Sequence, residues 1–165
     1  MFADAPRAGL LRRLAAIVYD SLIVVALLMF AMTLALAAVA GLVSLGLISL
    51  QGYQDSADYI QQHALWFQGY LLLWLFWFYL YFWCKGGQTL GMRAWRLLLL
   101  QQNGQPVTWR QALIRALTAL FGVGNFWLWI RFGKGLALQD QLSGTQVVLL
   151  TKEQSSALNL HRQAK

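Results

Sequence analysis

The stretch from Arg13 to Ala40 reads RLAAIVYDSLIVVALLMFAMTLALAAVA, and it decides the fold class. From Leu14 onward it contains one charged residue, Asp20, in an apolar run long enough to cross a bilayer. Because seven residues separate Arg13 from Asp20, two helical turns place both on one face, with the carboxylate about 10 Å further along the axis. A carboxylate at that depth costs a few kcal/mol unless it is paired, hydrated or protonated. We therefore expect the groups that contact Asp20 to organise the protein.

The composition also indicates a membrane protein. Of the 165 residues 59% are hydrophobic and 14% aromatic, and the apolar residues form runs without helical or strand alternation. The net charge of +7 comes from residues at the edges of these runs, where Lys and Arg set topology and contact anionic headgroups. We therefore expect a lipid bilayer, and not nucleic acid, as the partner. The single cysteine, Cys84, excludes an internal disulfide and a cysteine-based metal site within one chain, and we expect no cofactor.

A signal peptide is an alternative interpretation of the N-terminus. Arginines precede the apolar run, and Ala38-Val39-Ala40 resembles a cleavage site. The run is about twice the usual length of a signal core and contains Asp20. We therefore interpret it as a retained helix.

The chain predicts two membrane spans joined by an outside loop. Residues 1–12 are a basic, cytoplasmic lead-in, and the first span covers 13–40. The loop at 51–63 contains two aspartates but no Lys or Arg, which places it outside. The second span, 65–84, is crowded with aromatic residues. Helix packing and interfacial belts explain them, while the alternative is an aromatic wall for a flat or lipid-like ligand.

After the second span, Lys85, Arg93, Arg96 and Arg110 indicate a cytoplasmic segment. The apolar run 96–102 followed by Asn103-Gly104 predicts a short β-hairpin, in which Pro106 confines its strand to an edge. Residues 146–150 are expected to supply a third strand.

Thr108 and Gln111 form a capping-box pattern that begins a helix. The segment 108–131 is expected to be a membrane-associated hairpin, re-entrant or interfacial, with a third full crossing as the rival. A crossing would bury Arg115 and would place five further positive residues outside, namely Arg131, Lys134, Lys152, Arg162 and Lys165. Residues 151–165 are expected to form a flexible tail.

Three motifs in this order resemble the RDD family of small bacterial membrane proteins, named for one arginine and two aspartates. The first is Ala8-Gly9 followed by Arg13-Leu14-Ala15-Ala16 and Asp20. The other two include, in order, Gly86, Gly87, Gln88, Thr89, Gly91 and Arg93, and then Asp140, Gly144 and Thr145. The resemblance covers residues 7–150 and implies that Arg13, Asp20 and Asp140 are the family's arginine and aspartates.

The resemblance implies a bacterial inner-membrane location and little about function. The family has been suspected of transport, and some members look like sodium or proton antiporters. The chain departs from the family pattern in two places. Gln139 stands where His is frequent and Gln141 where Arg is frequent, and the glycine motif reads Leu90-Gly91-Met92-Arg93 where it usually continues as Gly-Lys-Arg after a proline. Loss of the histidine removes the obvious proton-titrating partner of Asp140.

Two interpretations of the charged residues follow. In the first, Asp20 and Asp140 form a cation or proton site whose ionisation Arg13 or Arg115 controls, and because two spans cannot enclose a pathway the protein is a homo-oligomer. In the second, the charges are structural, with Asp20 paired to Arg115 while Asp140 caps a helix or pairs with Arg13 or Arg93.

A further hypothesis is a non-catalytic accessory or assembly subunit of a larger membrane complex. An enzyme is not expected, because His63 and His161 lie on opposite sides of the predicted topology and Gly133-Lys134-Gly135 lacks the rest of a phosphate loop. The predicted fold is an all-α membrane protein with two transmembrane helices, a re-entrant or third transmembrane helix hairpin and a small cytoplasmic β element. The membrane domain is predicted to cover 13–150.

Overall fold

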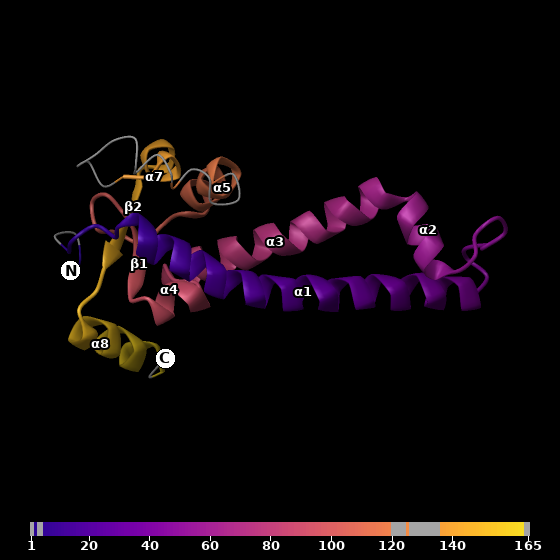
Figure 1. Cartoon of the computed structure of the whole chain (residues 1–165), viewed down its shortest axis with the longest axis horizontal. Coiled ribbons are helices and arrows are strands. Elements are labelled where there is room, and N and C mark those ends of the chain that lie inside the picture. The colour runs from indigo at the N-terminus through magenta and orange to yellow at the C-terminus, as the bar shows by residue number, and fades with distance from the viewer. Residues whose placement is uncertain (1, 3–4, 120–124, 126–135, 164–165) are drawn as a thin grey trace. The chain divides into compact units, whose positions relative to one another are not determined.

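The computed structural model describes residues 2, 5–119, 125 and 136–163. It is mostly helical, with two long apolar helices and one two-stranded sheet (Figure 1). The chain divides into two compact units. We call Met1–Leu22 together with Tyr79–Lys165 the motif unit, because it contains all three motifs, and we call Ile23–Phe78 the loop unit.

The two long helices coincide with the predicted spans. Helix α1 covers Leu10–Ser44 and α3 covers Ala64–Gly86, and each is long and apolar enough to cross a membrane. The 35 residues of α1 extend for about 52 Å, which exceeds a hydrocarbon core of about 30 Å. Part of α1 can therefore lie outside the hydrocarbon.

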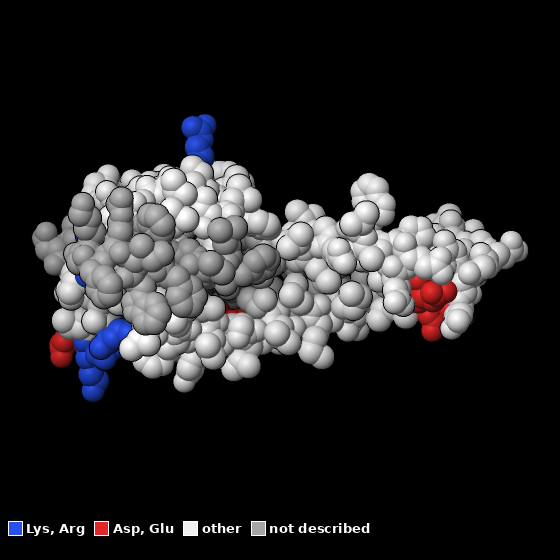
Figure 2. Space-filling view, turned by 45° about the horizontal axis from the view of Figure 1, so that its top comes forward, with Lys and Arg blue, Asp and Glu red and all other residues white. Residues whose placement is uncertain are grey.

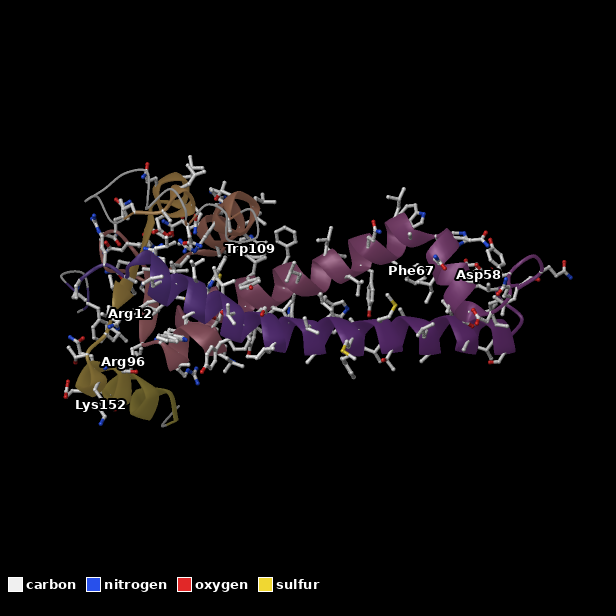
Figure 3. The ribbon with its side chains drawn as sticks, in the orientation of Figure 1. Arg12, Asp58, Phe67, Arg96, Trp109 and Lys152 are labelled. Carbon is white, nitrogen blue, oxygen red and sulfur yellow. The ribbon has the colours of Figure 1, made fainter. Side chains whose placement is uncertain are left out.

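Within the loop unit, α1 packs against α2 (Ser56–Gln62) and α3. Asp55 caps α2 by accepting a hydrogen bond of 2.8 Å from the amide of Asp58. The core contains Ala35, Val39 and Ile60, with Phe67 of α3 packed against them (Figure 3). Small residues on α1 thus allow the helices to approach closely.

The sheet lies in the motif unit. Strand β1 (Leu97–Gln101) pairs antiparallel with β2 (Thr145–Leu149), with Leu99 opposite Val147. One face of the sheet packs in a core of Leu98, Leu100, Val148 and Leu150.

Both edges of this sheet are covered by other segments of the chain. The amide of Ala8 donates to Val147 O over 2.9 Å, and the amide of Leu149 donates to Pro6 O over 2.8 Å. On the opposite edge, the amide of Leu99 donates to Gly87 O over 2.7 Å. The N-terminal lead-in and the glycine motif therefore protect a sheet that would otherwise expose two edges.

The β element differs from the predicted hairpin. The turn at Asn103-Gly104 is present, with Gly104 at a φ of 82°. No strand follows it within the described residues, and β1 pairs instead with β2, the strand expected at 146–150. Pro106 has no amide hydrogen, which removes one ladder donor from the segment after the turn.

Short helices complete the motif unit. They are α4 (Leu90–Ala94), α5 (Trp109–Thr118), α7 (Leu138–Ser143) and α8 (Lys152–Gln163). Helix α8 occupies the segment that we expected to be a flexible tail. A capping box begins it, because the amide of Thr151 donates to Gln154 Oε1 while the amide of Gln154 donates to Thr151 Oγ1.

Helix α5 begins at the capping box predicted from Thr108 and Gln111. It ends at Thr118, so ten residues of the predicted 108–131 hairpin are helical here. Residues 120–124 and 126–135 lie outside the described residues. The choice between a re-entrant hairpin and a third crossing depends on these residues and stays a prediction.

Candidate functional site

Asp20 is buried in α1 and contacts the middle motif. The hydroxyl of Thr89 donates to Asp20 Oδ2 over 2.5 Å, and the amide of Gly91 donates to Oδ1 over 2.8 Å. Thr89 is also the N-cap of α4, since its Oγ1 accepts from the amide of Met92. Asp20 therefore lies at the N-terminal turn of α4, where free amides favour a carboxylate.

This arrangement requires glycine at position 91. A Cβ there would lie 2.2 Å from Ala16 O and 2.9 Å from Asp20 Cγ. Gly87 is also constrained, because its φ of 64° is left-handed and a Cβ would lie 2.6 Å from Leu99 O. Gln88, between these glycines in the motif, donates to Leu97 O over 2.6 Å. The middle motif thus joins Asp20 to the edge of the sheet.

Asp140 is the centre of a second buried cluster. Its Oδ2 accepts from Nη1 of Arg13 over 2.6 Å, and its Oδ1 accepts from Nη1 of Arg115. Oδ2 also accepts from the amide of Ala137 over 3.0 Å, at the start of α7. The two arginines bring α1 and α5 together on this carboxylate.

Neighbouring polar groups hold both arginines. Nη1 of Arg115 also donates to Oγ1 of Thr145 over 2.9 Å, and that oxygen lies 2.7 Å from Ser143 Oγ. Nε of Arg13 donates to Ala8 O over 3.0 Å. Gly144, with a φ of 64°, ends α7 and leads directly into β2, which brings Thr145 beside Arg115. The third motif thereby supplies both the carboxylate and its supporting hydroxyls.

The cluster keeps Asp140 ionised. Burial alone would raise the pKa of this carboxyl, but the guanidinium groups of Arg115 and Arg13 outweigh burial and hold the pKa below its ordinary value of 3.8. Two positive groups surround one negative group, so the cluster carries a formal charge of +1.

These contacts decide between several pairings that the sequence allowed. Asp140 both caps α7 and pairs with Arg13, as the structural interpretation predicted. The predicted pair of Asp20 and Arg115 is wrong, because Arg115 binds Asp140 and Asp20 makes no salt bridge with a described residue. Arg93 is exposed and likewise forms no salt bridge among the described residues.

Some polar contacts could not be read from the sequence. Nε2 of Gln139, at the position where the family often has His, donates to Oδ1 of Asn125 over 2.9 Å. Three buried polar atoms have no hydrogen-bond partner among the described residues: Nη2 of Arg13, Nε of Arg115 and Oε1 of Gln139. Capping residues such as Thr89 are recognisable by their residue type, but the carboxylate that Thr89 contacts is not.

The two aspartates therefore have different chemical possibilities. Asp140 is fixed as a carboxylate by two guanidinium groups, and protonation would break both ion pairs. Among the described residues Asp20 receives hydrogen bonds from neutral donors alone, so it can gain or lose a proton, or exchange it for a cation, without separating a salt bridge formed with them. Of the two, Asp20 is the carboxyl whose partners among the described residues carry no charge.

Comparisons with known proteins agree with the motif arrangement. A search of curated proteins and a search of solved structures each found no match. The model of the RDD family matches residues 7–144, which include the residues of the three motifs from Ala8 to Gly144. With that match and two helices able to cross a bilayer, the chain is a membrane-associated protein that belongs to the RDD family.

Proposed function

We propose that this protein is a multi-pass protein of the bacterial inner membrane that moves ions or small solutes as a homo-oligomer, by cation or proton exchange at Asp20. The single observation that carries the proposal is the environment of Asp20. This carboxyl is 3% exposed, lies within a helix that is long and apolar enough to cross a membrane, and accepts hydrogen bonds from Thr89 and Gly91 without a cationic partner among the described residues. Intramembrane carboxyls without fixed countercharges mark ion and proton pathways.

Asp140 has a structural role in this proposal. Its ion pairs with Arg13 and Arg115 join α1, α5 and α7, and they keep the motif unit assembled while Asp20 changes its protonation. A cluster with two cations is a poor site for another cation. The exchange chemistry is therefore assigned to one aspartate and not to both.

The charge distribution supports an orientation. All 13 Lys and Arg residues belong to the motif unit, whereas the loop unit has none and carries Asp55 and Asp58. Figure 2 shows the carboxylates of the loop unit as a red patch without blue neighbours on the face drawn. By the positive-inside rule the N-terminus is cytoplasmic, residues 51–63 are outside, and the basic residues contact anionic headgroups.

The proposed transport also requires oligomerisation. Within the described residues two helices are long enough to cross the bilayer, and two helices do not enclose a polar path. Exposed apolar residues on both helices, including Leu22, Met29 and Leu73, are available for a neighbouring subunit or lipid. We propose a homo-oligomer in which the path runs between copies.

The test is sodium- and proton-driven flux into liposomes that contain the purified protein. Asp20→Asn is the informative variant, because the asparagine oxygen can still accept from the Gly91 amide while the charge is lost. The matched control is Glu153→Gln, which removes an exposed carboxylate of α8. We expect flux in the wild type and control and none in Asp20→Asn. Equal flux in Asp20→Asn, with unchanged oligomeric state and circular dichroism, would remove Asp20 from the pathway.

The second candidate is a non-catalytic accessory subunit of a larger membrane complex. The exposed apolar residues of α1 and α3 favour it, because a partner helix can cover them as well as lipid can. No flux from the wild type, together with stoichiometric copurification of one larger membrane protein, would support this function over transport.

A further inference from the structure

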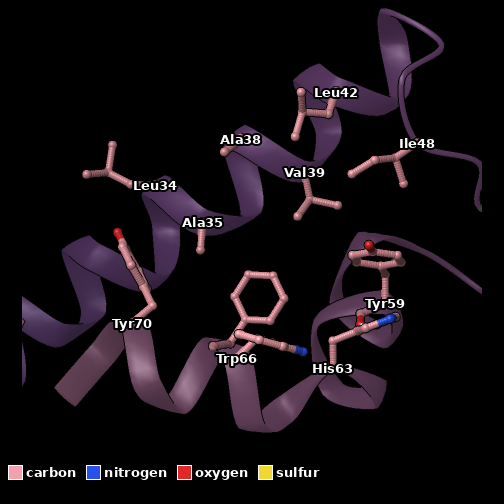
Figure 4. A pocket seen from close by; sticks show the side chains of 11 residues that line it. Leu34, Ala35, Ala38, Val39, Leu42, Ile48, Tyr59, His63, Trp66 and Tyr70 are labelled. Atoms are coloured by element: carbon pink, nitrogen blue, oxygen red, sulfur yellow. The ribbon is translucent and has the colours of Figure 1, made fainter. Parts of the chain in front are cut away.

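A groove lies between α1 and the α2–α3 segment of the loop unit. Its volume is about 640 Å³, within the range of about 300–1,000 Å³ for small-molecule sites. Leu34, Ala38 and Leu42 line one wall, and Trp66 and Tyr70 line the opposite wall (Figure 4). Every residue that lines it belongs to the loop unit.

Because the chain is membrane-associated, we expect lipid, and not water, to surround the groove. It opens between two helices that are each able to cross a bilayer, and its α1 wall is entirely apolar. Water has few polar partners along such a wall, whereas a hydrocarbon chain makes dispersion contacts along its whole length. An acyl chain from the bilayer therefore fits the groove better than a polar solute does.

One end of the groove is polar and aromatic. The rings of Tyr59 and His63 stack there with centroids 4.4 Å apart, and His63 Nδ1 lies 2.9 Å from Tyr59 O. Trp66, which is 82% exposed, follows at the start of α3 and offers an indole N–H. Tyr and Trp side chains of this kind favour the headgroup level of a membrane.

The helix that supplies Tyr59 to this end carries negative charge. Asp58 directly precedes Tyr59 in α2, and Asp55 is the N-cap of the same helix. The loop unit contains no Lys or Arg that could offset them. A headgroup at this end is therefore favoured if it carries a positive group, and an anionic headgroup is repelled.

We propose that the groove binds one acyl chain of a zwitterionic aminophospholipid, phosphatidylethanolamine, with its ammonium group facing Asp55 and Asp58. The aromatic end of the groove holds the lipid at the interface, and the apolar wall of α1 holds the chain. The lipid is thus a bound component of the loop unit. This inference is independent of transport, since it concerns residues that the proposed exchange at Asp20 does not use.

Native mass spectrometry of the full-length protein tests the groove. The protein is taken from vesicles with equal amounts of phosphatidylethanolamine and phosphatidylglycerol into mild detergent. Ala38→Phe places a ring in the groove, and Ala37→Phe is the control, because Ala37 is also exposed on α1 but does not line the groove. We expect one retained phosphatidylethanolamine in the wild type and control, and about tenfold less in Ala38→Phe. Equal retention in the two variants would overturn the site.

The headgroup assignment is tested separately. Asparagine keeps the capping oxygen at both positions, so Asp55→Asn with Asp58→Asn removes charge without removing the α2 cap. The double variant should retain phosphatidylglycerol as readily as phosphatidylethanolamine. A wild type without preference between the two lipids would contradict the headgroup assignment, and a dimer mass without lipid would show that a second copy covers the groove instead.

Discussion

At the scale of single residues, Asp140 is the carboxylate that joins α1, α5 and the start of α7. It is fully buried and accepts hydrogen bonds from Arg13, Arg115 and the amide of Ala137. Its removal leaves two guanidinium groups without a countercharge in a buried site, and such a loss destabilises more than the pair itself stabilises.

We therefore predict that Asp140→Asn lowers the free energy of unfolding by about 3–5 kcal/mol. Thermal unfolding in detergent at neutral pH measures this effect. The control is Glu153→Gln at an exposed position of α8, which should change stability by less than about 0.5 kcal/mol. Equal melting temperatures for the two variants would show that the cluster does not stabilise the fold.

The same carboxyl predicts a dependence on acid. Because its pKa is lower in the folded protein than its ordinary value of 3.8, the unfolded chain binds the proton more readily. The stabilisation is complete above pH 3.8 and is lost as the pH falls through the folded pKa. Melting curves from pH 7 to pH 3 should show the difference between wild type and Asp140→Asn becoming smaller with acid. A difference that is constant over this range would contradict the ion pairs.

Gly91 offers a steric test of the Asp20 contact. A methyl group at this position would meet Ala16 O and Asp20 Cγ, so Gly91→Ala must displace α4 from α1. We predict a loss of about 1–3 kcal/mol in stability. Gly69→Ala in α3 is the matched control, because a Cβ there has open space and alanine favours a helix by up to about 1 kcal/mol. Melting of both variants at the wild-type temperature or above it would show that α4 and α1 do not approach closely at Gly91.

At the scale of elements, the sequence predicted the positions of the helices better than the contacts between them. The apolar runs predicted α1 and α3 to within a few residues, since length and hydropathy are local properties. The capping pattern at Thr108 predicted the start of α5 for the same reason. The capping pattern at Thr151 and Gln154 marks the start of α8 in the same way. This pattern is the local signal from which a helix, and not a flexible tail, can be predicted here.

Contacts between residues that are far apart in the sequence could not be predicted from local patterns. Thr89 and Gly91 reach Asp20 across 69 and 71 residues, and a charge-pairing argument favours an arginine over a hydroxyl and an amide. Arg115 had two aspartates available, and only the fold places it beside Asp140 and Thr145. The resemblance identified Arg13, Asp20 and Asp140 as special residues. Only the three-dimensional structure distinguishes a charged cluster at Asp140 from a site with neutral hydrogen-bond donors at Asp20.

Helix α5 carries a prediction about the membrane interface. Arg115 faces inward to Asp140, which leaves Trp109 and Leu117 about 60% exposed on the outer face (Figure 3 labels Trp109). Exposed Arg110 adds a positive group beside this apolar face, as in helices that lie at a headgroup boundary. We predict that a spin label at Leu117→Cys, in a Cys84→Ala background, is more accessible to oxygen than to a water-soluble nickel reagent. A label at Gln105→Cys, in the exposed turn, should show the opposite preference. A preference for the nickel reagent at both positions would place α5 in water.

At the scale of the whole molecule, the separation of charge between the two units is the property on which the proposed orientation rests. The loop unit has no Lys or Arg, while the motif unit has all 13, so translocating the loop unit moves no positive charge. Both chain ends lie in the motif unit, so the two crossings of the proposed topology would keep both ends on one side of the membrane.

We predict that a membrane-impermeant maleimide labels Gln54→Cys in intact spheroplasts and labels Gln105→Cys only after permeabilisation, both in the Cys84→Ala background. Both glutamines are exposed, so a difference in labelling reports sidedness and not burial. Labelling of Gln105→Cys in intact spheroplasts, with Gln54→Cys protected, would show that the orientation is the reverse of the proposed one.

Replacing Gln51, Gln54 and Gln61 by lysine adds three positive charges to the loop while leaving the 13 in the motif unit. This variant should therefore insert less completely and keep its orientation, because the larger positive charge still lies on the cytoplasmic side.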